Sequence, residues 1–217
     1  MSIKNIINLY RDQINSQLLK IYSKGPITIY KPIQYVLSGG GKRIRPLLSI
    51  LTAEACGGKK ENILNAALAI EVLHNFTLVH DDIMDQDLVR HGKKTVHEKW
   101  DVGVAILSGD AMLALALKLI NQSPHSHEQM NIFIDGLLAV CEGQALDKEF
   151  EKNNDVTLEN YLDMINKKTA HMIGMSSEIG SLILDLSLDE SYHFKKFGKY
   201  IGLAYQIQDD LLEVFAD

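Results

Sequence analysis

The chain is poor in cysteine, with only two cysteines in 217 residues. Cys56 and Cys141 lie in apolar segments with helical spacing, and neither stands at a metal-ligand spacing. This scarcity argues against a disulfide framework and against a cysteine-rich zinc site. We expect two buried free thiols in a protein from a reducing compartment.

An excess of positive charge and a membrane-directed segment are also lacking. The formal net charge is −6, which argues against a general nucleic-acid binder, so a local basic cluster or a metal ion must hold any anionic substrate. The N-terminus is polar within its first five residues and has no signal-peptide core. The longest apolar run, Ala111–Leu117, is followed by Lys118 and is far too short to span a bilayer. We expect a soluble, cytoplasmic protein without a transmembrane segment.

Strand-like alternation, repeats and low-complexity linkers are absent too, and the apolar residues recur at helical spacing. With 46% hydrophobic residues, residues 1–217 can bury the core of a single domain. Pro46 is predicted to start its helix, and Thr157 or Asp155 to cap another. The sequence predicts an all-α antiparallel helix bundle. The expected helices are 2–22, 32–38, 46–56, 61–85, 101–120, 128–150, 157–184 and 189–215.

An acidic cluster ends the apolar helix predicted over 61–85. Asp81 and Asp85 are four residues apart, so they project from one helix face about 5.4 Å from each other. His74 lies seven residues before Asp81 on nearly the same stripe. A solvated acidic run is the alternative, but a long apolar helix is a poor place for one. Carboxylates this close need a counter-charge, and their hard oxygens suit Mg²⁺ with bound phosphate, so the cluster predicts a magnesium-diphosphate site.

The run Gly39-Gly40-Gly41 precedes a cationic helix start. Glycines let the backbone approach a ligand closely, and free N–H groups at a helix start attract anions. Lys42 and Arg45, three residues apart, add two charges on one side. The alternative is a flexible loop with ordinary surface cations. The run is not a Walker motif, because the spacing differs and no strand precedes it.

Three further segments carry polar groups at helical spacing. Gln144 and Asp147 are three apart, and the segment YQIQDDLLE contains a second acidic cluster. Lys168-Thr169 lies mid-helix, where the lysine either serves a site or only extends its stem along apolar surface. Two acidic clusters that face each other across a bundle would hold several Mg²⁺ ions around one diphosphate. The second cluster consists of Gln206, Asp209, Asp210 and Glu213.

From about residue 35 onward, the chain resembles the trans-isoprenyl diphosphate synthases, also called polyprenyl synthetases. The resemblance implies an isoprenoid-synthase bundle around a central cavity, three Mg²⁺ ions and a homodimer. It also implies head-to-tail condensation of isopentenyl diphosphate with an allylic diphosphate (dimethylallyl, geranyl or farnesyl). The matching segments, in family order, are GGGKRIRPLL, EVLHNFTLVHDDIMDQDLVRHGKKTVH, LSGDAMLALAL, CEGQALDKEF, YLDMINKKTA and GLAYQIQDDLLEVF.

The resemblance also assigns roles to individual residues. It makes Asp81, Asp85 and Asp209 the metal ligands, supported by Asp82 and Asp210. Lys42, Arg45 and His74 resemble the pocket for the isopentenyl diphosphate head group. The residues that resemble contacts to the allylic diphosphate are Arg90, Lys168, Thr169 and Gln206.

Three departures from the family pattern stand out. His91 replaces the second of two arginines, which makes isopentenyl diphosphate binding weaker and pH-sensitive. Glu213 replaces an aspartate at the least demanding position of the second acidic motif. The sequence ends at Asp217, where family members continue with further helices, so we expect either a fragment or a naturally short chain.

This shortness leaves open a non-catalytic or regulatory subunit of a prenyl synthase, although both acidic clusters are kept. A class I terpene cyclase is a third alternative, which the GGGKRIRP segment disfavours because a cyclase needs no second diphosphate pocket. Helix geometry places Thr77 in line with Asp81 and turns Phe76 to the flank. An aromatic residue followed by a small one at these positions resembles archaeal-type geranylgeranyl diphosphate synthases and implies a C20 product.

Overall fold

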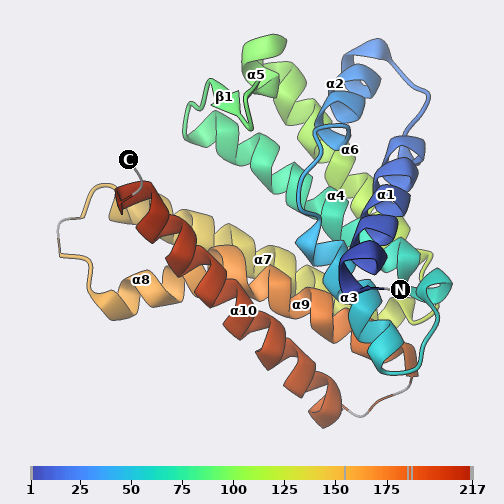
Figure 1. The fold of residues 1–217 in the computed structure, drawn as a ribbon. Coiled ribbons are helices and arrows are strands. Elements are labelled where there is room, and N and C mark those ends of the chain that lie inside the picture. Colours follow the sequence, from blue (N-terminus) through green and yellow to red (C-terminus); the bar gives the residue numbers. More distant parts are fainter. Residues whose placement is uncertain (1, 154, 185, 187, 216–217) are drawn as a thin grey trace. The chain divides into compact units, whose positions relative to one another are not determined.

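The computed structural model describes residues 2–153, 155–184, 186 and 188–215 of the chain. It divides into two compact units, and we describe each unit by itself. The first unit contains the residues up to Leu47 together with Asn65–Gln122. The second contains Leu48–Leu64 and the residues from Ser123 onward. Most described residues are helical, which confirms the all-α class (Figure 1).

The elements follow one another with short connections. The helices are α1 (Ile3–Ile21), α2 (Ile27–Leu37), α3 (Ile44–Ala55), α4 (Lys60–Met84), α5 (Val96–Lys99), α6 (Val102–Asn121), α7 (Ser126–Phe150), α8 (Leu158–Ile165), the π-helical turn η1 (Asn166–Ala170), α9 (His171–Ser181), the 3-10 turn η2 (Leu182–Leu184) and α10 (Leu188–Phe215). Two short strands, β1 (Val89–Arg90) and β2 (Lys93–Lys94), form an antiparallel hairpin.

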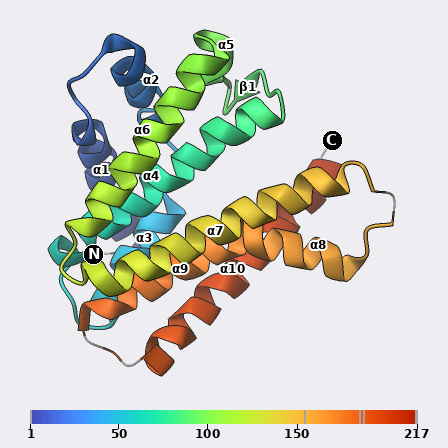
Figure 2. The ribbon, with the colours of Figure 1, turned by 180° about the vertical axis from the view of Figure 1, so that it is seen from behind.

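In the first unit, the C-terminal part of α4 lies beside α6 (Figure 2). A glycine makes this approach possible, because a Cβ at Gly109 would stand only 2.2 Å from Nε2 of His80. Asp101 starts α6, and its side chain accepts a hydrogen bond of 2.7 Å from the Val104 amide. The fully buried core side chains of this unit include Ile14, Leu18, Ile33, Leu37, Ile70, Leu73 and Met112.

In the second unit, α10 packs along α9, and α7 lies on the other side of α9 (Figure 2). Glycines let α10 approach both α9 and the π-helical turn η1 closely. A Cβ at Gly198 would lie 2.6 Å from the Ile173 carbonyl oxygen, and one at Gly202 would lie 2.6 Å from Cα of Ala170. A larger residue at either position would force the two backbones apart. The buried core includes Phe133, Met172, Ile173, Met175 and Ile179.

The predicted helices are confirmed, but several boundaries were wrong. Helix α2 begins at Ile27 and contains Pro32, and α3 begins at Ile44, so Pro46 is its third residue. A proline lacks only a donor that the first turn leaves unsatisfied in any case, so this position costs little. The helix predicted over 157–184 contains a π-helical turn, and Thr157 caps it in a capping box with Asn160.

Two further features differ from the sequence-based expectation. Cys56 and Cys141 are thiols outside any disulfide, but Cys56 is only half-buried and Cys141 is exposed, so the expected burial was wrong. Among the described residues, α4 and α6 are long and apolar enough to cross a membrane by length and composition. Core helices pass the same test, and 72% of the apolar window of α4 is buried, against 33% of that of α6.

Candidate functional site

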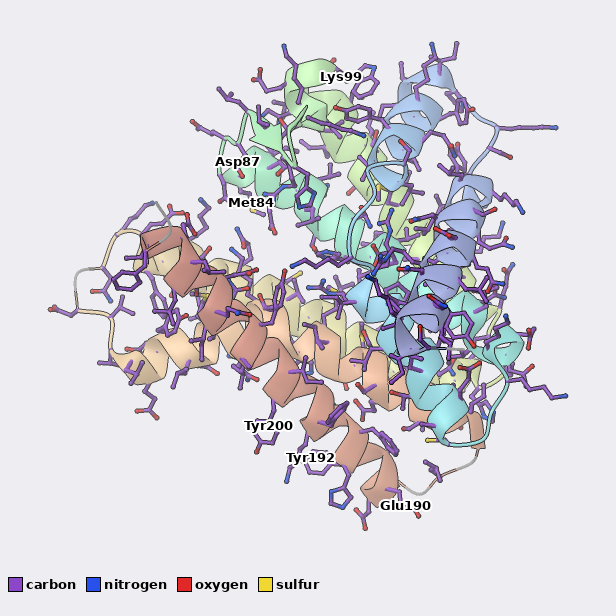
Figure 3. All side chains as sticks on the ribbon, in the orientation of Figure 1. Met84, Asp87, Lys99, Glu190, Tyr192 and Tyr200 are labelled. Atoms are coloured by element: carbon purple, nitrogen blue, oxygen red, sulfur yellow. The ribbon has the colours of Figure 1, made fainter. Side chains whose placement is uncertain are left out.

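The first acidic cluster lies where α4 ends, and Met84 and Asp87 mark this end in Figure 3. The Asp85 amide donates 2.8 Å to the Asp81 carbonyl, so helical geometry continues and the two carboxylates lie one turn apart on one face. Asp81 is half-buried and Asp85 is exposed. Asp82 does not belong to this face, because its side chain is buried.

Arg90 connects the hairpin to this helix end. Its Nε donates to the buried carboxylate of Asp82, and its second guanidinium nitrogen donates 3.0 Å to Asp87. Burial raises the pKa of the Asp82 carboxyl, and the hydrogen bond and charge of Arg90 oppose that rise. Asp82 therefore holds the guanidinium in place and leaves Asp81 and Asp85 as the carboxylates that share a face.

The basic loop predicted after α4 is a β-hairpin. Val89 pairs with Lys94 and Arg90 with Lys93, so His91 and Gly92 form the two-residue turn. Both turn residues have positive φ, 50° and 75°, as a type I′ turn requires. Histidine is one of the few non-glycine residues enriched in this region, so His91 occupies a position that few side chains tolerate.

A basic cluster surrounds His74. Burial and then the charges of Arg45, Arg43, Arg90 and His91 hold the pKa of His74 well below its usual range. The charges that act on this imidazole come from the loop before α3, from the first turn of α3 and from the hairpin after α4. His74 is neutral at pH 7 and offers a hydrogen-bonding group rather than a charge.

Arg43 lies next to Lys42 in the loop before α3, and no pattern in the sequence distinguishes it from a surface cation. In the structure it anchors this cationic loop. Its guanidinium donates 2.6 Å to Glu71, 2.9 Å to Asn15 and 3.0 Å to the Leu37 carbonyl oxygen, and it is buried. Its backbone has a φ of 53°, a strained region that these contacts hold. Lys42, next to it, is exposed. The three partners lie 6 to 28 residues away, so sequence spacing gave no signal for this role.

The two residues predicted to set product length are both buried, with 8% of each residue exposed. The Phe76 ring packs edge-on against His80, with centroids 4.7 Å apart, on the side of α4 that approaches α6. The Thr77 hydroxyl donates 2.8 Å to the His74 carbonyl, about one turn earlier in the same helix.

In the second unit, the π-helical turn η1 presents Lys168 and Thr169. A Cβ at Gly143 would stand 2.3 Å from the Lys168 amide nitrogen, so this glycine lets η1 approach α7 closely. Lys168 Nζ lies 2.5 Å from a carboxylate oxygen of Asp147, which shows that the lysine does more than extend along apolar surface. Gln144, one turn before Asp147, is buried.

A chain of hydrogen bonds leads from η1 to α10. Thr169 donates 2.8 Å to Gln206, and Gln206 donates 2.7 Å to Asp210. Tyr161 of α8 donates 2.5 Å to the other oxygen of Asp210, a contact that the sequence analysis missed because 49 residues separate the two. Burial and this carboxylate raise the pKa of Tyr161 to about 12. Asp210 is thus fixed by neighbours, while Asp209 beside it is half-buried and Glu213 is exposed.

The two carboxylates that share a face at the end of α4 suit a magnesium ion. Within the described part of each unit, no group of three or more His, Cys, Asp or Glu side chains is arranged to hold a metal ion. Magnesium commonly takes one or two carboxylates and completes its shell with water and phosphate oxygens. Asp81 and Asp85 on one face, with Asp82 engaged by Arg90, provide such a pair.

Comparison with known proteins agrees with this chemistry. The sequence profile described as Polyprenyl synthetase matches residues 26–217. The geranylgeranyl diphosphate synthase of Sulfolobus acidocaldarius is 40% identical over 97% of this chain and 66% of its own length. The short chain isoprenyl diphosphate synthase of Methanocaldococcus jannaschii is 42% identical over 92% of this chain and 62% of its own length. The solved geranylgeranyl pyrophosphate synthetase of the archaeon Geoglobus acetivorans superposes with a TM-score of 0.93 at 36% identity, over 96% of this chain and 70% of that one.

The chain belongs to the polyprenyl synthetase family. Its fold is the all-α fold of isoprenoid synthases, as the sequence analysis predicted. The chain spans about two thirds of the length of the curated relatives that it matches.

Proposed function

We propose that this protein is a Mg²⁺-dependent trans-prenyltransferase that joins isopentenyl diphosphate head-to-tail to an allylic diphosphate, namely dimethylallyl, geranyl or farnesyl diphosphate. The observation that supports this most is the basic cluster around His74. Arg45, Arg90 and His91 approach a neutral imidazole on the helix stripe that ends in Asp81. Cations and metal-binding carboxylates on one stripe suit a diphosphate and its Mg²⁺ ions.

In this proposal each group has a role. Lys42, Arg45, His74 and His91 bind the isopentenyl diphosphate head group. Arg90, Lys168, Thr169 and Gln206 bind the allylic diphosphate. The groups that would hold magnesium, three ions in all, are Asp81, Asp85 and Asp209, and the ions would supply charge stabilisation to the leaving diphosphate.

The chemistry requires one bond to break, one to form and one proton to leave. The C–O bond of the allylic diphosphate breaks, and its electron pair departs with the diphosphate, whose growing charge Lys168 and Arg90 stabilise. The double bond of isopentenyl diphosphate then attacks the allylic carbon and forms the new C–C bond. The released diphosphate accepts the proton that restores a double bond. An apolar cavity keeps water from the cation.

The product, assembly and location belong to the same proposal. Thr77 leaves space deep in the site and Phe76 narrows it, so the product is the C20 geranylgeranyl diphosphate. The chain forms one synthase domain, which acts in the cytoplasm as a homodimer. The exposed apolar side chains of α6 support the dimer, since Val102, Ile106 and Leu107 are 48%, 44% and 56% exposed.

The test is incubation of the protein with labelled isopentenyl diphosphate and each allylic diphosphate in turn, with Mg²⁺ or with a chelator. We expect labelled product only with an allylic primer and Mg²⁺. Cyclic hydrocarbon formed without isopentenyl diphosphate would instead indicate a terpene cyclase. Failure to form any product with every primer would overturn the proposal.

A further inference from the structure

Tyr35 lies at the meeting point of three elements of the first unit. It belongs to α2, and its hydroxyl donates 2.8 Å to the backbone carbonyl of Lys94 on β2. Its ring contacts Trp100, just after α5, edge-on with centroids 5.4 Å apart. One side chain therefore connects α2, the hairpin and the end of α5.

The position of the Tyr35 ring is fixed on more than one side. The ammonium of Lys99, labelled on α5 in Figure 3, lies 4.0 Å from its centroid, and that of Lys93 lies 6.0 Å from it. Lys99 also lies 5.2 Å from the Trp100 ring. These cation–π contacts hold the phenol in one orientation. Tyr35, Lys99 and Trp100 border a surface depression of about 540 Å³.

The hydrogen bond from Tyr35 reaches the strand opposite Arg90. Lys94 pairs with Val89 across the hairpin, and Thr95 closes its base by bonding to Leu88 (3.1 Å) and to the Asp87 carbonyl (2.7 Å). Each strand of the hairpin is thus bonded to a helix. On β1, Arg90 donates to Asp82 of α4, and on β2 the Lys94 carbonyl accepts from Tyr35 of α2. Two-stranded hairpins are marginal alone, so such anchors determine where the turn lies.

We propose that Tyr35 is a positioning residue for diphosphate binding, because it fixes the hairpin that carries His91 and Arg90, whose guanidinium is bonded to Asp82 of α4. Tyr35 itself contacts no substrate in this proposal. The inference rests on the proposed function only for the identity of the ligand. The anchoring of the hairpin stands on the contacts above.

The test compares Tyr35→Phe with Tyr30→Phe, the same change on the same helix at a half-buried tyrosine. Loss of one neutral hydrogen bond corresponds to a roughly 3- to 10-fold change. We expect amide hydrogen exchange over residues 88–95 to accelerate by that factor in Tyr35→Phe and to stay unchanged in Tyr30→Phe. Trp100 is the single tryptophan of the chain and touches the Tyr35 ring, so a change in its fluorescence would report a shift of that ring in Tyr35→Phe.

Ligand readouts separate positioning from general loosening. We expect the KM for isopentenyl diphosphate and the Kd for inorganic diphosphate to rise roughly 3- to 10-fold in Tyr35→Phe, with kcat within about twofold of wild type. The proposal would be overturned if amide hydrogen exchange over residues 88–95 is unchanged in Tyr35→Phe. It would also be overturned if exchange is faster while the KM for isopentenyl diphosphate and the Kd for inorganic diphosphate stay unchanged. If the wild type does not turn over isopentenyl diphosphate, the proposed function fails, whereas the diphosphate Kd still tests Tyr35. Absence of diphosphate binding by the wild type would overturn both.

Discussion

Arg43 and Glu71 form an ion pair of 2.6 Å in which only 3% and 4% of the two side chains is exposed. The pair joins the cationic loop to α4, so the backbone that carries Lys42 and Arg45 is fixed to the helix that carries His74 and Asp81. The site in the first unit therefore depends on a buried contact that takes no part in the chemistry.

Breaking this pair should destabilise the protein strongly. Glu71→Gln keeps the shape but leaves the Arg43 charge buried without compensation, which should lower the free energy of unfolding by about 3–5 kcal/mol. Glu151→Gln is the matched control, since Glu151 pairs with Lys148 at 2.7 Å and is 53% exposed, and should cost under about 1 kcal/mol. Urea unfolding measures both. Equal losses in the two variants would show that burial of the Arg43 pair has no energetic importance.

Replacing His91 with arginine tests the departure from the family pattern. A guanidinium stays charged between pH 6 and pH 8, whereas an imidazole loses most of its charge over that range. We expect His91→Arg to lower the apparent KM for isopentenyl diphosphate, with a larger effect at pH 8 than at pH 6. If KM is the same for both proteins at both pH values, His91 lies outside the binding site.

His171 predicts how stability depends on pH. Burial, and then the charges of Lys195 and Lys199, lower the pKa of this imidazole to about 4. Between pH 4 and about 6.5 the unfolded chain binds a proton at this position that the folded protein does not, so stability falls as the pH is lowered through this window. His171→Gln should flatten that part of the profile in urea unfolding at several pH values. An unchanged slope would assign the acid sensitivity to other groups.

Product length should respond to the two residues before the acidic cluster. Because Thr77 shares a stripe with Asp81, Thr77→Phe should fill space along the growing chain and shorten the product from C20 toward C15. Phe76→Ala removes a buried ring and should lengthen the product beyond C20. Chromatography of dephosphorylated products measures both. If both variants keep the wild-type length, other residues determine the depth of the cavity.

The sequence predicted the helices because these depend on local spacing. Apolar periodicity and glycine or proline breaks fix where helices occur, and the pair Asp81 and Asp85 follows from helix geometry alone. The boundaries were less accurate, since Pro32 is tolerated inside α2 in the folded protein.

What the sequence did not predict depends on contacts between distant residues. A strand of two residues is too short to show an alternating pattern of apolar and polar side chains, so the hairpin was not predicted. Its bond to Asp82 is recognised only in the folded structure. In the sequence, nothing distinguishes Arg43 from a surface cation. The structure shows its hydrogen bonds to Asn15 and Glu71, each 28 residues away. The Tyr161 contact to Asp210 and the π-helical turn that presents Lys168 are likewise products of packing.

The most direct test of the proposed activity is the Mg²⁺-dependent incorporation of labelled isopentenyl diphosphate into an allylic primer by wild type and Asp81→Ala. Asp81 is half-buried near the end of α4, so its removal should leave the circular dichroism spectrum and thermal unfolding close to wild type. We predict that kcat falls by several orders of magnitude, because one of the carboxylates that would hold magnesium is lost. An unchanged Mg²⁺-dependent rate in a folded Asp81→Ala variant would contradict the account.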